Sequence, residues 1–170
     1  DYFENIANFP EGVNNGLDCA MVIYDSVSGD LLGIVGQVGE KKAEQLLNLA
    51  TVPHTPGSAL KPIALYAPLI DSRKINYATV FDDSPIVFNK KGDFYLEYPK
   101  NYPNHYAGLT TVKDAIRLSK NTVAVRLYNL LGAESIYDSL KNDYGFDTLV
   151  RRRVTDDGKI LTDLASSPLA

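Results

Sequence analysis

Cysteine, histidine and tryptophan are scarce in this sequence of 170 residues, which has one cysteine, two histidines and no tryptophan. Cys19 has no second cysteine to pair with, so the chain cannot form an internal disulfide, and its apolar neighbours favour a buried structural thiol over a nucleophile. One cysteine together with His54 and His105 is too little for a typical structural zinc site. We therefore expect no metal and no cofactor.

Long apolar runs and an excess of basic charge are also missing. No run approaches the ~18 to 20 apolar residues of a membrane-spanning helix, so we expect the chain as it stands to be soluble. The 17 lysines and arginines against 21 aspartates and glutamates leave a net charge of −4, whereas a nucleic-acid-binding domain would show a basic face. The one basic cluster, Arg151–Arg153, precedes Asp156 and Asp157 and is typical of a solvated, self-neutralising surface. Nucleic acid is therefore not an expected partner.

The composition that remains is that of a globular protein, with 45% hydrophobic residues and enough length for one domain. We expect this domain to be partial and to occupy residues 1–170. Its expected parts are a lead-in over 1–17, a strand pair over 18–38, a helical part with the functional motifs over 58–150, and an incomplete tail over 151–170.

The strand pair consists of two β-rich runs, Asp18–Asp25 and Leu31–Val38, separated by the turn residues Ser26–Asp30. Both runs are more continuously apolar than alternating, which predicts a hairpin covered on both faces by helices. The later pattern predicts helices separated by a loop-rich stretch over 72–109. The expected helices are 41–48, 59–71 with a kink or end at Pro68, 111–118, 122–131 and 134–144.

Ser58 and Lys61 are the first pair with chemical meaning. They lie three residues apart at the start of a predicted helix, which stacks both side chains on one face about 5 to 6 Å apart at Cβ. A neutral lysine can take the proton of a serine hydroxyl, and the helix N-terminus adds backbone N–H groups where an oxyanion would develop. Such a pair alone is usually a surface serine and a solvated lysine. Pro56-Gly57, however, forces a sharp turn into the helix, the arrangement that presents a nucleophile at a cleft.

The second element is Ser119-Lys120-Asn121, which lies between two helical runs. A hydroxyl and an amide two residues apart on a connection can both point into one cleft. The plainer interpretation is that Asn121 caps the helix that begins at Thr122.

In this order the motifs are similar to the S-x-x-K and S-D-N elements of class A β-lactamases and penicillin-binding proteins, whose third element is K-T-G. Over nearly its whole length the chain resembles the transpeptidase domain of class A, bifunctional penicillin-binding proteins. The matching stretches are Ala20–Asp25 with Ser28–Asp30, Asn48–Thr51, Pro56–Pro62, Asp83–Pro85, Asn101-Tyr102 with Gly108, and Ser119–Leu127. Lysine at position 120, where β-lactamases carry aspartate, and the lack of a deacylating glutamate motif favour a transpeptidase over a hydrolase.

The resemblance implies a peptidoglycan D,D-transpeptidase that cross-links stem peptides through a serine acyl-enzyme. Ser58 would attack the D-Ala–D-Ala bond, and Lys61 would be the base that activates it. Penicillins and other β-lactams would acylate Ser58 without easy release. The parent protein would be membrane-anchored and would act at the extracytoplasmic face of the bacterial membrane.

The resemblance also implies roles for the residues around this pair. Ser119 would relay the proton toward the leaving amine. Asn121 would act as a donor that orients Lys61 and the substrate amide. Gly57 and Lys120 are expected to contact the substrate.

The third element is missing, because no Lys-Thr-Gly or Lys-Ser-Gly follows Asn121. In the family that triplet lies on a later strand whose backbone supplies the second oxyanion donor, and its lysine would help to lower the pKa of the activating lysine. We therefore expect an α+β, β-lactamase/DD-transpeptidase-like fold without its C-terminal strands, with a mostly helical subdomain and an N-terminal β-hairpin. The isolated chain should react slowly or not at all with penicillin.

An incomplete sheet has an unpaired edge, and such edges favour association. Besides stem peptides and β-lactams, the expected partners are therefore the missing C-terminal part of the parent domain and, through that edge, a second copy of the chain. Two other functions stay open. A non-catalytic penicillin-binding-like module would sense or scaffold with Ser58 unused. An S-x-x-K amidase would need a glycine- and serine-rich region with a second catalytic serine, which this sequence lacks.

Overall fold

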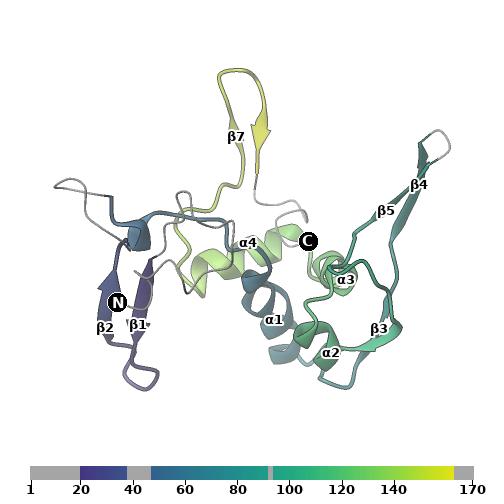
Figure 1. Cartoon of the computed structure of the whole chain (residues 1–170), viewed down its shortest axis with the longest axis horizontal. Coiled ribbons are helices and arrows are strands. Elements are labelled where there is room, and N and C mark those ends of the chain that lie inside the picture. The colour runs from purple at the N-terminus through teal and green to yellow at the C-terminus, as the bar shows by residue number, and fades with distance from the viewer. Residues whose placement is uncertain (1–19, 38–46, 92–93, 163–170) are drawn as a thin grey trace, which may run out of the picture. The chain divides into compact units, whose positions relative to one another are not determined.

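The computed structural model describes residues 20–37, 47–91 and 94–162. The chain divides into two compact units, 1–54 and 55–170. Figure 1 locates the elements of both units along the chain. The expected lead-in and most of the expected helix over 41–48 lie outside the described residues.

The first unit contains the predicted hairpin. Strands β1 (Met21–Tyr24) and β2 (Leu31–Val35) pair antiparallel, with Met21 opposite Val35. The Asp25 carboxylate accepts the backbone N–H groups of Val27 and Ser28 at 2.7 and 3.0 Å, which closes the turn. A short 3-10 helix, η2 (Leu49–Thr51), follows.

The apolar side chains of both strands are exposed, from 37% at Val22 to 65% at Leu32. The expectation that both faces are covered is therefore wrong for the described residues. A continuous apolar pattern shows which side chains favour burial, but it does not specify the segment that buries them.

The second unit opens with the helical stretch predicted after Pro56. It is wound in three ways: a 3-10 helix η3 (Gly57–Leu60), a π-helix η4 (Pro62–Tyr66) and an α-helix α1 (Ala67–Asp71). Pro68 has no N–H to give to the turn before it, and its ring crowds that turn. The preceding residues accordingly take the wider π winding, in which the Ala67 N–H reaches the Pro62 carbonyl. The irregularity expected at Pro68 therefore falls on the turn before it.

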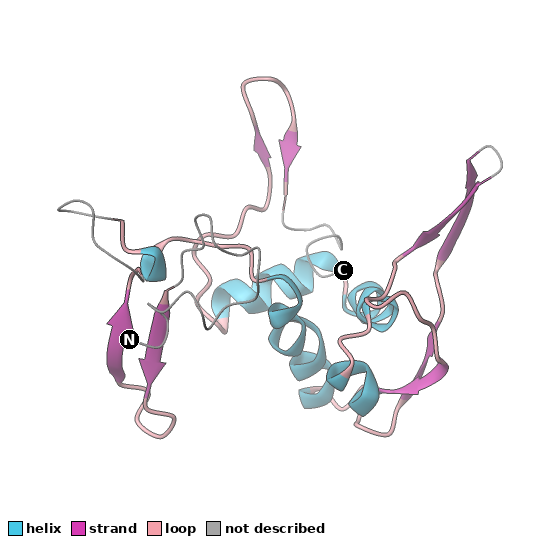
Figure 2. Cartoon of the chain, viewed as in Figure 1, coloured by secondary structure: helices cyan, strands magenta, loops and turns pink. Residues whose placement is uncertain are grey.

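The stretch 72–109, predicted to be loop-rich, also contains strands that were not predicted: β3 (Val80–Asp83), β4 (Val87–Lys91), β5 (Phe94–Tyr98) and the start of β6 (Gly108–Thr111). Strand β3 pairs antiparallel with β6, and β4 with β5 (Figure 2). These strands have four or five residues, and β3 ends in two aspartates, which are unfavourable in strands. The pairing of β3 with β6 joins segments far apart in the sequence, which no local pattern reveals.

The three helices that follow agree closely with the sequence prediction. They are α2 (Val112–Arg117), α3 (Asn121–Leu131) and α4 (Ala133–Asn142). A hairpin of β7 (Arg153–Val154) and β8 (Ile160–Leu161) lies in the expected tail, for which no strands were predicted. The Thr111 hydroxyl accepts the Asp114 N–H at 3.2 Å, as expected for a capped start. Gly132, at φ +82°, ends α3.

The core of this unit is apolar and centred on α3. Helix α3 packs against η4, α4 and β3 (Figure 1). The fully buried side chains at its centre include Leu65, Leu69, Val112, Val123 and Leu127. None of the helices within the described ranges has the length and apolar character to cross a membrane.

The connection from α2 to α3 is a Schellman motif, the tight C-terminal turn in which two backbone amides bond back into the helix. The Ser119 N–H donates to the Ile116 carbonyl at 3.1 Å, and the Lys120 N–H donates to the Ala115 carbonyl at 2.9 Å. Ser119 occupies the left-handed position of this motif, with φ +50°. Glycine is the usual residue there, since a side chain strains the backbone.

The strain at Ser119 can be measured with two variants that remove the same hydroxyl. Ser119→Gly should be more stable than Ser119→Ala by about 1 kcal/mol, because only glycine is relaxed at this φ. The free energy of unfolding from urea titration tests this difference. In the interior of an α-helix the order should reverse, because alanine favours the helix more than glycine does. Ser139→Ala in α4 should therefore have a free energy of unfolding about 1 kcal/mol higher than Ser139→Gly. Equal stability of the two variants at position 119 would contradict the left-handed turn.

Candidate active site

Gly57 and Ser58 begin the helical stretch of the second unit. Gly57 has φ +56°, and no atom lies within 4 Å of the position that a Cβ would take. Backbone conformation, rather than crowding, therefore favours glycine here. Ser58 is exposed, and its carbonyl accepts the backbone N–H of Lys61. One tight turn thus joins an exposed hydroxyl to the lysine three residues on.

Lys61 points inward, with only 2% of its surface exposed. Its Nζ donates to the Ser119 carbonyl at 3.1 Å and to Ser119 Oγ at 3.3 Å, and it also donates to Asn121 Oδ1. The structure therefore brings Lys61, Ser119 and Asn121 together from segments far apart in the sequence, next to the turn that presents Ser58.

Burial changes the acidity of Lys61. Removing the ammonium from water disfavours its charged form, which lowers the pKa of Lys61 from 10.5 to about 8. About one molecule in ten then has a neutral Lys61 at pH 7, compared with about one in three thousand at the ordinary value. The sequence argument assigned part of this lowering to a second lysine in the third motif, but here burial is the cause.

Asn121 is oriented by both ends of its amide. Oδ1 accepts from Lys61, while Nδ2 donates to the Lys100 carbonyl at 2.7 Å. Two expectations for this residue need correction. Toward Lys61 it is an acceptor rather than a donor, and it is the first residue of α3 rather than its side-chain cap. The Asn101 Oδ1 fills the capping position instead, since it accepts the Asn121 N–H at 2.8 Å.

Lys120, expected at the substrate surface, is buried. Its Nζ lies 2.6 Å from the Asp83 carboxylate and donates a hydrogen bond to the His105 carbonyl at 3.1 Å. This ammonium faces the interior, so we reassign Lys120 from substrate contact to the support of the turn. The error has a general cause: lysines on connections between helices are mostly exposed, and only a buried counter-charge reverses this.

Asp83 and Asn101 are the residues that the sequence argument did not place at the site. Both residues lie in stretches that resemble the family, but the sequence of these stretches did not indicate a role for either residue. The partners of Asp83 lie 18 to 39 residues away in the sequence, which no local pattern reveals. Within the described residues no group of histidine, cysteine, aspartate and glutamate could hold a metal ion.

A family model described as the penicillin-binding protein transpeptidase domain matches residues 19–165. The chain is 35% identical over 127 residues to penicillin-binding protein 1A from Clostridium botulinum, which covers 70% of this chain and 15% of that protein. It is 30% identical over 130 residues to penicillin-binding protein 1F from Bacillus subtilis, and this match covers 76% of this chain and 17% of that protein. The chain thus spans only a small part of the relatives that it matches.

The fold has a counterpart among solved structures. The chain superposes on the crystal structure of penicillin-binding protein 1A from Haemophilus influenzae with a TM-score of 0.62 and 26% identity, covering 86% of this chain and 22% of that one. This match confirms the predicted α+β, DD-transpeptidase-like class. The chain belongs to the family of transpeptidase domains found in penicillin-binding proteins such as 1A.

Proposed function

We propose that this chain carries the acylation centre of a peptidoglycan D,D-transpeptidase, with Ser58 as the nucleophile and Lys61 as the base. The supporting observation is the buried Lys61 amine. It meets Ser119 and Asn121 within hydrogen-bonding distance and lies one tight turn from the exposed Ser58. Family membership supports the same chemistry, since S-x-x-K is an acylating motif in these proteins.

In the first step Ser58 becomes a nucleophile. A neutral Lys61 amine has two hydrogens, which it donates to the Ser119 carbonyl and Asn121 Oδ1. Its lone pair then accepts the proton of the Ser58 hydroxyl. The Ser58 oxygen bonds to the carbonyl carbon of the penultimate D-Ala of a stem peptide, giving a tetrahedral oxyanion.

In the second step the bond from this carbon to the nitrogen of the terminal D-Ala breaks. Lys61 returns the proton through the Ser119 hydroxyl, which lies 3.3 Å from Nζ, and the leaving amine takes it. An ester on Ser58 remains. The amine of a second stem peptide attacks this ester, and the oxygen of Ser58 recovers its proton. A β-lactam opens in the same first step, but its amine stays attached.

The isolated chain should perform this chemistry poorly. A typical oxyanion-hole donor contributes about 10² to 10³ in rate, and the strand with the third triplet supplies one in the family. Stem peptides, β-lactams and the extracytoplasmic face of the membrane are accordingly proposed as the partners and location of the whole protein. The remainder of the parent domain and a second copy of the chain remain proposed partners for the edges of the β1–β2 hairpin, which pair with no further strand among the described residues.

Incubation with a fluorescent penicillin tests the assignment of Ser58. We expect slow covalent labelling that intact mass and peptide mapping locate at Ser58. Ser58→Ala should abolish it, while Ser135→Ala, which changes an exposed serine of α4, should leave it unchanged. Labelling at another residue would contradict the nucleophile assignment, and rapid stoichiometric labelling would contradict the proposed impairment.

The pH dependence of this labelling tests the role of Lys61. Since the base must be neutral and its pKa is about 8, the rate should rise through pH 8 and level above it. Between pH 7 and pH 9 the increase should be about tenfold, compared with about a hundredfold and no plateau for a pKa of 10.5. Lys61→Met should remove the labelling, and Lys113→Met should not change its profile. A rate independent of pH would count against Lys61 as the base.

A further inference from the structure

A buried polar cluster lies beside the site and has no part in the proposed chemistry. It consists of Asp83, Asn101, Lys120 and Thr122, all buried. Buried polar groups are costly unless they are satisfied, and buried ions especially so. A cluster of this kind therefore needs an explanation.

Asp83 is the centre of the cluster and is 0% exposed. Its carboxylate accepts from Lys120 Nζ at 2.6 Å, from Asn101 Nδ2 at 2.6 Å, from the Ala107 N–H at 2.9 Å and from the Thr122 hydroxyl. Burial by itself would raise the pKa of Asp83, but these four donors outweigh it and lower that pKa to about 2. Asp83 is therefore a fixed negative charge that holds Lys120 from inside the protein.

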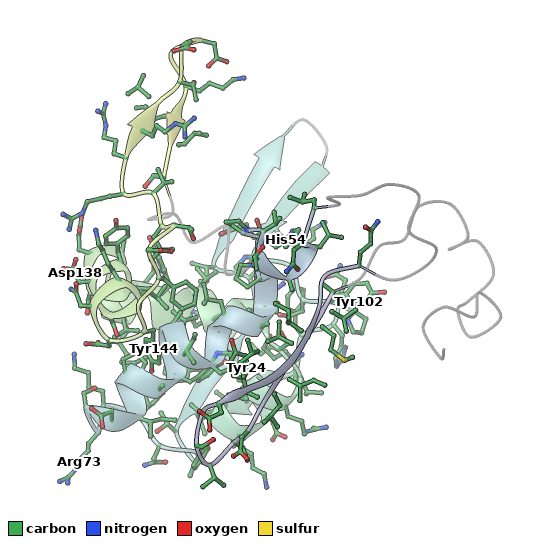
Figure 3. The ribbon with its side chains drawn as sticks, turned by 90° about the vertical axis from the view of Figure 1, so that its left-hand side faces the viewer. Tyr24, His54, Arg73, Tyr102, Asp138 and Tyr144 are labelled. Carbon is green, nitrogen blue, oxygen red and sulfur yellow. The ribbon has the colours of Figure 1, made fainter. Side chains whose placement is uncertain are left out.

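Asn101 connects this charge to the start of α3. Its Oδ1 accepts the Asn121 N–H at 2.8 Å and the Thr122 N–H at 3.4 Å, while its Nδ2 donates to Asp83 and to the His105 carbonyl. The next residue, Tyr102, which is labelled in Figure 3, is 92% exposed, whereas Asn101 is 6% exposed, so these adjacent residues of the loop have opposite environments. The side-chain amide of Asn101 thus caps α3 although Asn101 lies far from that helix in the sequence.

Three sets of contacts fix the turn 119–121 between α2 and α3. The Schellman bonds hold the backbone of Ser119, Asp83 holds the side chain of Lys120, and Asn101 holds the first amides of α3. The acceptors that remain directed at Lys61 are the Ser119 carbonyl, Ser119 Oγ and Asn121 Oδ1. We propose that Asp83 and Asn101 are positioning residues, which together with Lys120 fix the turn 119–121 as one wall of the buried surroundings of the Lys61 amine, called the Lys61 pocket below.

Stability alone explains this cluster less well. Replacing a buried ion pair by groups without charge is often neutral or stabilising, although removal of one partner is strongly destabilising. A positioning role therefore makes a separable prediction: a variant without either charge stays folded, but its Lys61 pocket opens. The proposal rests on the proposed function for the use of Lys61, yet the closure of the pocket can be measured without any substrate.

The measurement is the pKa of Lys61 in the 170-residue chain, from ¹³Cε-labelled lysine followed by NMR over pH, with the signal identified by its loss in Lys61→Arg. In the double variant Asp83→Asn/Lys120→Met and in Asn101→Ala, water should reach the amine. Its pKa should then rise by about one unit or more toward 10.5. Asp82→Asn is the matched control, because its carboxylate is the neighbour in β3 but is half exposed and pairs with Arg126 at 3.6 Å. This control should leave the pKa of Lys61 near 8.

Folding is checked in each variant by amide exchange at Leu127, which is fully buried in α3. An unchanged Lys61 pKa in the folded double variant would overturn the proposal, and so would an equal rise in Asp82→Asn. These outcomes are independent of penicillin labelling at Ser58. A chain that shows the pKa shift but is labelled at a residue other than Ser58 would refute the proposed nucleophile and leave the positioning role supported.

Discussion

The contact between the Lys61 amine and the turn that begins α3 organises this molecule. It joins two segments 58 residues apart in the sequence, and it does so with three acceptors for the three hydrogens of an ammonium. The pocket is closed enough to remove Lys61 from water, which is why its pKa falls to about 8. The same contact places the amine beside the hydroxyl that would relay a proton. The packing of these segments, the pKa of Lys61 and the proposed proton transfer thus all depend on the hydrogen bonds between Lys61 and the residues Ser119 and Asn121.

Two local arrangements here are unfavourable in themselves. Among the residues that the structure describes, no carboxylate is a hydrogen-bond partner of the buried Lys61. A serine occupies a left-handed position that favours glycine. Strain of this kind persists where the surroundings over-determine it, and it concentrates at functional sites. In this chain the surroundings are the apolar core below η4 and α3 and the polar cluster around Asp83.

The sequence was most informative where a motif is short and continuous. Ser58 and Lys61 share one turn, and Ser119 and Asn121 flank a single residue, so each pair could be read from a few consecutive letters, and the order of the motifs supplied the resemblance to the family. The hairpin at β1 and β2 and the helices α3 and α4 were also predictable from apolar runs and from glycines at their ends.

What the sequence did not reveal depends on contacts between distant segments. The pairing of strands β3 and β6 joins segments far apart in the sequence, which no local pattern indicates. Lys120 looked like a surface lysine because its counter-charge, Asp83, lies in another element. The residues that contact Lys61 could therefore be predicted from the sequence, whereas the residues that support the turn 119–121 could not.

The capping of α3 by Asn101 has a consequence for how this domain assembles. A helix whose first amides are satisfied by its own neighbouring residue can form its first turn locally. Here the acceptor arrives on a loop that precedes the helix by some twenty positions, so the first turn is complete only after that loop has docked. The wall of the pocket and the start of the helix must consequently become ordered in the same event.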